Sequence, residues 1–186
     1  EALEKGQYKH TQKDLAGDFG YSLSTINLAL KKPTQIGAIR KTSRFFVLND
    51  FKKLLYYWAT NRNLAKDVVY QTFFSGSVTE AEGLVPPEAI YAGYTAGKKI
   101  LGEAAADYAK LYFYIDSSKL IEVKKRFPKQ KVGETEIFVL KLGPGKKINS
   151  KITTLPQTFV DIWNMADWYA KDFIKNLEEK IDGLLS

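Results

Sequence analysis

The chain contains no cysteine, one histidine and one methionine among its 186 residues. Without cysteine it forms no disulfide, supplies no thiolate nucleophile and binds no zinc through sulfur. Such a composition is typical of a reducing compartment. The sequence also lacks an apolar run near the roughly 20 residues of a membrane span, and it lacks the pattern of a signal peptide. We therefore expect a cytoplasmic protein with no membrane partner.

Acidic residues are scarce in the first third of the chain. Residues 1–66 carry 12 basic and 5 acidic side chains, whereas residues 67–186 carry 16 of each, so the whole formal charge of +7 lies in the first part. Such an asymmetry indicates a polyanionic partner. Residues 28–66 contain a single acidic residue, Asp50, and nine basic residues. The basic residues are Lys31, Lys32, Arg40, Lys41, Arg44, Lys52, Lys53, Arg62 and Lys66.

The length and the charge break predict two domains. A chain of 186 residues can bury one large core or two modest ones. Because the charge balance changes near residue 66, we predict an N-terminal domain at 1–66 and a C-terminal domain at 67–186. The sequence begins at Glu1 without methionine, and residues 2–5 resemble the end of a helix, so we expect further residues upstream.

Two short helices with a tight turn are expected at residues 11–31. Thr11 is suited to cap a helix that ends at Gly20, and Ser22 to cap a second helix that Pro33 stops. Ala16, Gly20 and Ile26 have the spacing of a helix-turn-helix, although an αα-hairpin can reproduce part of it. The expected inward residues are Leu15, Ala16 and Phe19 in the first helix and Leu23, Ile26, Ala29 and Leu30 in the second.

A β-hairpin is predicted next. Residues 36–40 and 44–48 are β-prone runs around a polar tip, which is the pattern of a wing, and Asn49 or Asp50 can cap a helix over 51–61. The N-terminal domain is therefore predicted to be a winged helix-turn-helix that binds double-stranded DNA.

The candidate DNA-binding residues fall into a helix group and a basic group. Short hydroxyls suit base edges or phosphates, and Asn27 is the best candidate base reader because an amide can pair with adenine. No arginine lies on this helix, so strong guanine readout is not expected. The alternative for each residue is a solvated surface. The candidates are Ser22, Ser24, Thr25, Asn27, Lys31, Lys32, Arg40, Lys41 and Arg44.

The C-terminal domain is predicted to be mixed α and β, which makes the whole chain α+β. We expect strands at 68–74, 111–115 and 137–142, helices at 87–101, 117–126 and 156–185, and a break near 164–167. Glu80 and Glu82 are placed in a polar loop, and Gly143-Pro144-Gly145 in a turn. No metal, cofactor or catalytic residue is predicted.

Three segments together resemble the AbiEi-type antitoxins of type IV toxin-antitoxin systems and their archaeal relatives. They are the winged helix of 11–48, Tyr94-Thr95-Ala96-Gly97 ahead of the strand that ends at Asp116, and the stretch from Pro156 to Trp163. The last is similar to a Gln-Thr-aromatic-Val-Asp-Leu stretch in that family.

The resemblance implies a transcriptional repressor of its own operon that opposes a nucleotidyltransferase-like toxin encoded by a neighbouring gene. It also implies a C-terminal half resembling a degenerate nucleotidyltransferase fold. An active enzyme of that kind needs two carboxylates at i and i+2 on a strand, whereas the strand here ends in Asp116 alone. For the C-terminal domain we expect homodimerisation, binding of a partner or additional contacts with DNA phosphates. The alternatives are an active nucleotidyltransferase and a protein-interaction module that uses the winged helix.

Overall fold

The computed structural model describes residues 6–143 and 150–186. These residues form two compact units, the first comprising 6–61 with Gly143 and 184–186, and the second comprising Arg62–Leu142 with 150–183. The expected helix end at residues 2–5 and most of the turn at 143–145 lie outside the described residues. The fold is α+β, with two separate sheets. Within the described ranges, no helix has both the length and the apolarity to cross a bilayer.

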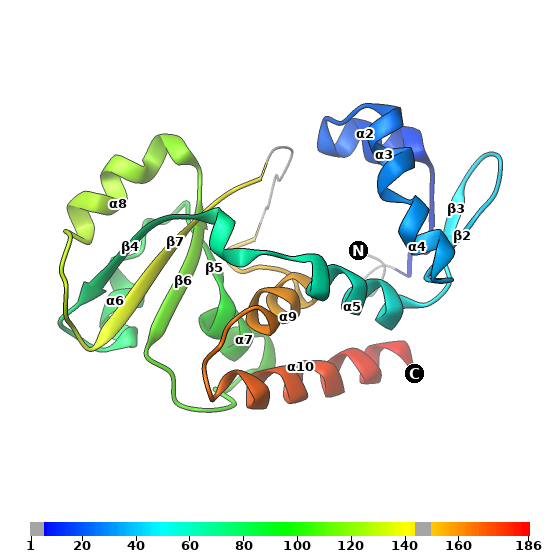
Figure 1. Ribbon diagram of the computed structural model, residues 1–186. Helices are drawn as coiled ribbons and strands as arrows, with labels where there is room; N and C mark the ends of the chain where they lie inside the picture. The colour runs from blue at the N-terminus through cyan, green and yellow to red at the C-terminus, as the bar shows by residue number, and fades with distance from the viewer. Residues whose placement is uncertain (1–5, 144–149) are drawn as a thin grey trace. The chain divides into compact units, whose positions relative to one another are not determined.

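The first unit combines short helices with a three-stranded sheet (Figure 1). The sheet order is β1-β3-β2, with both pairings antiparallel. Sequence reasoning missed β1, whose two residues pair with β3. The elements are β1 (Lys9–His10), α2 (Gln12–Phe19), α3 (Leu23–Ala29), α4 (Lys31–Gln35), β2 (Ile39–Lys41), β3 (Phe46–Leu48) and α5 (Phe51–Asn61).

The predicted helix caps of this unit are confirmed. The Thr11 side chain accepts a hydrogen bond from the backbone N–H of Asp14, and the Ser22 side chain accepts one from Thr25. Gly20 ends α2 in the left-handed conformation with φ of 67°. Asp50 caps α5 by accepting from the N–H of Lys53. Local side-chain chemistry therefore determines where these helices begin and end.

Two predictions for the helix pair are wrong, the stop at Pro33 and part of the inward set. Pro33 does not stop the second helix, because it lies inside α4. Proline has no N–H to donate to Ala29, so the helix breaks at Leu30 and then resumes. Of the residues expected to face inward, Ile26 is buried, whereas Phe19, Leu23 and Ala29 are exposed. Leu23 is the first residue of α3. A helical side chain points toward the N-terminus, and at the first residue there is no preceding helical turn for it to pack on, so Leu23 is exposed.

Substitution by alanine should stabilise α2 at Gly17, inside the helix, and destabilise it at Gly20, the C-cap. In Gly20→Ala the left-handed backbone costs about 1–2 kcal/mol, whereas Gly17→Ala adds a methyl group in open space inside the helix and stabilises it by about 0.5–1 kcal/mol. Hydrogen exchange of the α2 amides measures both changes. Equal effects of the two substitutions would contradict the assigned helix end.

The second unit is built on a four-stranded sheet of order β4-β7-β6-β5. The β6–β7 pair is parallel, and the two outer pairs are antiparallel. Its elements are η1 (Leu64–Asp67), β4 (Val68–Phe74), α6 (Val78–Leu84), β5 (Ile90–Ala92), α7 (Gly93–Leu101), β6 (Lys110–Ile115), η2 (Ser117–Lys119), α8 (Leu120–Arg126), β7 (Thr135–Lys141), α9 (Leu155–Trp163) and α10 (Ala170–Leu185).

Alternation along β6 divides the second unit into two packing layers. Leu111, Phe113 and Ile115 face a core that includes Ala81 of α6 and Val123 of α8. Tyr112 and Tyr114 point to the opposite face, where their partners come from α7 and α9. The sheet is therefore covered on both faces, as Figure 1 shows.

Two predictions for the second unit need correction. The helix expected over 87–101 is a short strand, β5, followed by α7. Gly93 opens α7 directly after β5 with φ of 55°, and a Cβ at this residue would lie 2.8 Å from Met165 and 3.2 Å from Tyr112. The loop expected around Glu80 and Glu82 is α6, because Ser77 and Glu80 form a capping box.

Candidate nucleic-acid interface

All nine candidate DNA-binding side chains are exposed and belong to the first unit. Ser22 is the N-cap of α3, and Ser24, Thr25 and Asn27 lie on that helix. Lys31 and Lys32 are the first two residues of α4. Arg40 and Lys41 lie in β2, and Arg44 lies in the turn before β3. Figure 1 shows the β2–β3 hairpin projecting from this unit. The structure thus leaves each candidate open to a ligand.

The hydroxyls at the start of α3 form a cluster of their own. The Ser22 hydroxyl lies 2.8 Å from that of Ser24 and 2.9 Å from that of Thr25. Because Ser22 also accepts the capping hydrogen bond, its first role is to hold the helix. Ser24 and Thr25 keep acceptor capacity on the exposed side of the cluster.

Asn27 is linked to the hairpin. The Lys41 ammonium donates a hydrogen bond of 2.5 Å to Asn27 Oδ1, joining β2 to α3. Two candidates that were chosen from the sequence for different reasons therefore form one group.

The hairpin carries positive charge on both of its faces and at its tip. Ile39 is buried, and side chains alternate along a strand, so Arg40 and Lys41 point to opposite faces. Arg44 lies in the turn that the Thr42 side chain closes by donating to the Phe45 carbonyl. Phosphates line a DNA groove on two sides, so cations on both faces of a hairpin suit such a groove.

Sequence reasoning missed one candidate contact, Leu28. Its side chain is 65% exposed and follows Asn27 on α3. An exposed leucine beside an amide can contact the methyl group of thymine. The signal was available, since Leu28 falls outside the inward spacing predicted for this helix.

The nine basic residues between 28 and 66 are not all exposed on the first unit. Lys53 forms an ion pair with Asp50 at 3.7 Å. Arg62 belongs to the second unit, where its side chain is 16% exposed. Lys66 also belongs to the second unit, and Lys52 is half-buried on α5. The exposed cations of the run that lie on α4 and the hairpin are Lys31, Lys32, Arg40, Lys41 and Arg44.

Arg62 enters a polar cluster inside the second unit. It donates hydrogen bonds to Asp67 at 2.5 Å and to the Tyr114 hydroxyl at 2.9 Å, and its Nε lies 3.5 Å from Asp161. Asp161 is fully buried and also accepts from Tyr114 and Gln157. Burial disfavours the charge of Arg62, but Tyr114 and the two carboxylates outweigh it and raise the arginine pKa.

Two segments that the sequence singled out contribute side chains to this cluster. Gln157 and Asp161 come from α9, which contains the Pro156–Trp163 stretch, and Tyr114 comes from β6. Their side chains meet in the interior, so they stabilise the second unit. Asp116 itself caps η2 by accepting from the N–H of Ser118.

The other inward carboxylates of this unit have protein partners as well. Glu82 accepts hydrogen bonds from Thr95 at 2.8 Å and from Tyr108 at 3.2 Å. Asp167 accepts from Tyr94 at 2.8 Å and forms an ion pair with Lys110 at 2.7 Å. Among the residues that the structure describes, no group of three or more His, Cys, Asp or Glu could hold a metal ion.

Buried tyrosines should make the second unit sensitive to alkali. Burial is the largest cause that raises the pKa of Tyr94, Tyr108, Tyr112 and Tyr114 above the ordinary 10.0. Above about pH 10 the unfolded chain loses these protons while the folded chain keeps them, so the free energy of unfolding falls as pH rises. This contribution is complete below pH 10.

Urea unfolding of a Trp58→Phe variant, followed by the fluorescence of the remaining Trp163 and Trp168 of the second unit, measures this change. The midpoint is expected to fall between about pH 10 and pH 11. A midpoint that stays constant over this range would show that the tyrosines ionise without a folding cost.

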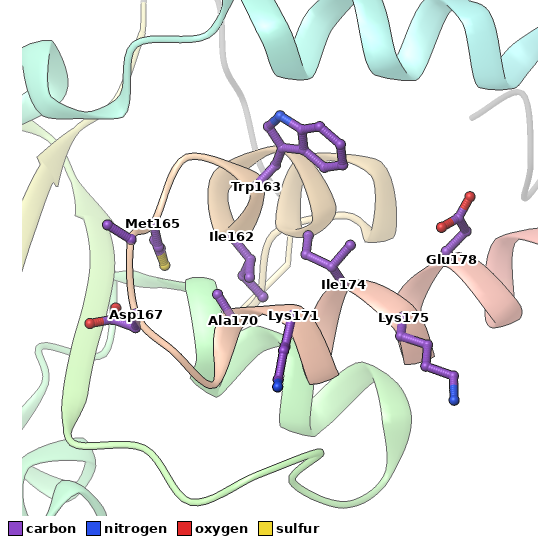
Figure 2. A pocket seen from close by; sticks show the side chains of 10 residues that line it. Ile162, Trp163, Met165, Asp167, Ala170, Lys171, Ile174, Lys175 and Glu178 are labelled. Carbon is purple, nitrogen blue, oxygen red and sulfur yellow. The ribbon is translucent and has the colours of Figure 1, made fainter.

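A shallow groove of about 510 Å³ lies between α9 and the first half of α10 (Figure 2). Ile162, Met165 and Ile174 give it an apolar lining, and Trp163 is 42% exposed at its edge. In Figure 2 the amino groups of Lys171 and Lys175 point away from Trp163. Because Asp167 is already paired with Lys110, the groove offers a ligand mainly apolar contact.

No family model matches the sequence, and comparisons with curated proteins and with solved structures give no match.

Proposed function

We propose that the protein is a sequence-specific DNA-binding transcriptional regulator whose first unit is a winged helix-turn-helix. The observation that carries the proposal is the meeting of an exposed, capped helix and a cationic hairpin through the contact between Asn27 and Lys41. Hydroxyl and amide groups for base edges lie on α3, and charges for phosphates lie on α4 and the hairpin. This division of roles is what recognition of duplex DNA requires.

We also propose that the regulator is an autorepressing antitoxin of a type IV toxin-antitoxin system. The support is the sequence resemblance to AbiEi-type antitoxins. In this proposal the second unit is a degenerate nucleotidyltransferase fold that serves dimerisation, binding of a toxin or further phosphate contacts. The buried roles of Tyr114, Gln157 and Asp161 agree with it, since the residues that carry the resemblance there stabilise the fold.

A binding assay tests the regulator proposal. The purified protein is titrated into a labelled duplex from upstream of its own gene and into a random duplex of equal length. The upstream duplex is expected to bind at least about 1,000-fold more tightly at physiological salt. Equal affinities for the two duplexes would contradict sequence-specific regulation. Protection of cells from the product of the neighbouring gene tests the antitoxin proposal separately.

A second candidate function is protein interaction through the first unit. It is favoured by the exposed apolar side chains of Phe19, Tyr21, Leu23 and Leu28, which lie on or beside α2 and α3. Exposed apolar groups of this kind mark protein contacts in many domains. Leu23→Ser would then weaken self-association or partner binding in sedimentation experiments and leave affinity for random DNA unchanged.

A further inference from the structure

The contact between Lys41 and Asn27 determines which way the Asn27 amide faces. A lysine ammonium carries only donors, so the atom that meets it must be the amide oxygen. The amide nitrogen, which is a donor, is then the end of Asn27 turned away from the lysine. Both side chains are exposed and lie on different elements, α3 and β2.

Together these residues form a pair of donors. Asn27 Oδ1 accepts from the Lys41 ammonium, which carries only donors, so the side of the pair next to this contact offers a ligand an ammonium beside an amide N–H. An asparagine that reads adenine needs both its oxygen and its nitrogen, because adenine shows an acceptor beside a donor in the major groove. Because the Lys41 ammonium lies against Asn27 Oδ1, the N6 amino group of adenine would meet another donor there, which disfavours adenine.

Guanine is the base whose major-groove edge fits such a pair. Its N7 and O6 are two adjacent acceptors, whereas cytosine shows a donor and thymine shows one acceptor beside a methyl group. We propose that Asn27 and Lys41 read one guanine of the operator as a joint donor pair, an inference that rests on the proposed DNA-binding function. It replaces the expectation, drawn from the sequence, of an adenine contact without guanine readout.

Selection from a library of random duplexes tests the base preference. The wild-type protein is expected to enrich a motif with an invariant guanine, and Asn27→Ala to lose the preference at that base pair. Lys41→Met removes the partner of the amide oxygen, so Asn27 becomes free to pair with adenine. The preference should then shift from guanine toward adenine by about 10-fold.

Two controls separate this inference from the proposed function. Lys32→Met removes the same charge from α4 and should weaken all sequences alike without changing the preferred base. Replacing the guanine by 7-deazaguanine removes N7 and should weaken wild-type binding about 10-fold, but should hardly affect Asn27→Ala.

The outcomes are distinct. If the wild-type protein enriches a motif but Lys41→Met leaves its base preferences unchanged, the donor pair is contradicted and the DNA-binding function stands. The donor pair is also contradicted if the wild-type motif has an adenine at the base pair where Asn27→Ala loses its preference. If the wild-type protein enriches no sequence, the proposed function fails, and the inference fails with it.

Discussion

Removing Arg40 and Arg44 together is expected to lower affinity for DNA about 30-fold at roughly 0.15 M salt. Each phosphate contact that is lost leaves about one counterion unreleased, which at this salt concentration corresponds to roughly a 5- to 6-fold loss. Arg40 lies on the hairpin face opposite Lys41, and Arg44 lies in the turn. Neither is expected to read bases, so Arg40→Ala/Arg44→Ala should weaken operator and random duplexes by the same factor.

Fluorescence anisotropy with the two duplexes measures this loss. The matched control is Lys171→Ala/Lys175→Ala, which removes two exposed charges from α10 of the second unit. The control should change affinity less than 3-fold, on the order of the effect of net charge alone. If the control pair matched the hairpin pair, the effect would come from overall charge, and the hairpin would have no special role.

Replacing Asp161 by alanine is expected to cost the second unit about 3–5 kcal/mol of its free energy of unfolding. The carboxylate is fully buried, and its removal leaves the Arg62 guanidinium with Asp67 as its remaining anionic partner in the cluster. Tyr114 and Gln157 also lose an acceptor. Such a loss approaches the whole stability of a small domain. Urea unfolding followed by tryptophan fluorescence measures it.

Two further variants identify the buried charge as the cause. Asp67→Ala removes a carboxylate that is 23% exposed, so water can replace it and the loss should be smaller. In Arg62→Met/Asp161→Asn neither buried charge remains. This double variant should lose less free energy of unfolding than the sum of the losses measured for Arg62→Met and Asp161→Asn singly. Strict additivity would mean that Arg62 and Asp161 do not interact.

Features with a local physical cause could be predicted from the sequence. Thr11, Ser22 and Gly20 bound their helices through caps that involve only neighbouring residues. The strand predicted over 68–74 matches β4, since β-branched and aromatic residues dominate it. The break between α9 and α10 was also predicted from the sequence.

Features that depend on distant partners could not be predicted. The two residues of β1 form a strand because they pair with β3, which follows much later in the sequence. Arg62 was counted with the basic run because nothing in its neighbourhood shows that Tyr114 and Asp161 will enclose it. The Asn27–Lys41 pair likewise needs the hairpin to turn back toward α3. In each case tertiary contact decides the role of the residue.

The salt dependence of DNA binding tests the central claim most directly. The claim is that the exposed cations of the first unit bind the phosphates of duplex DNA. Affinity of the wild-type protein for the duplex upstream of its own gene is measured by anisotropy over a series of salt concentrations. About six phosphate contacts predict a slope of about −5 in a plot of log affinity against log salt concentration. A slope near zero, or no binding at low salt, would contradict the claim.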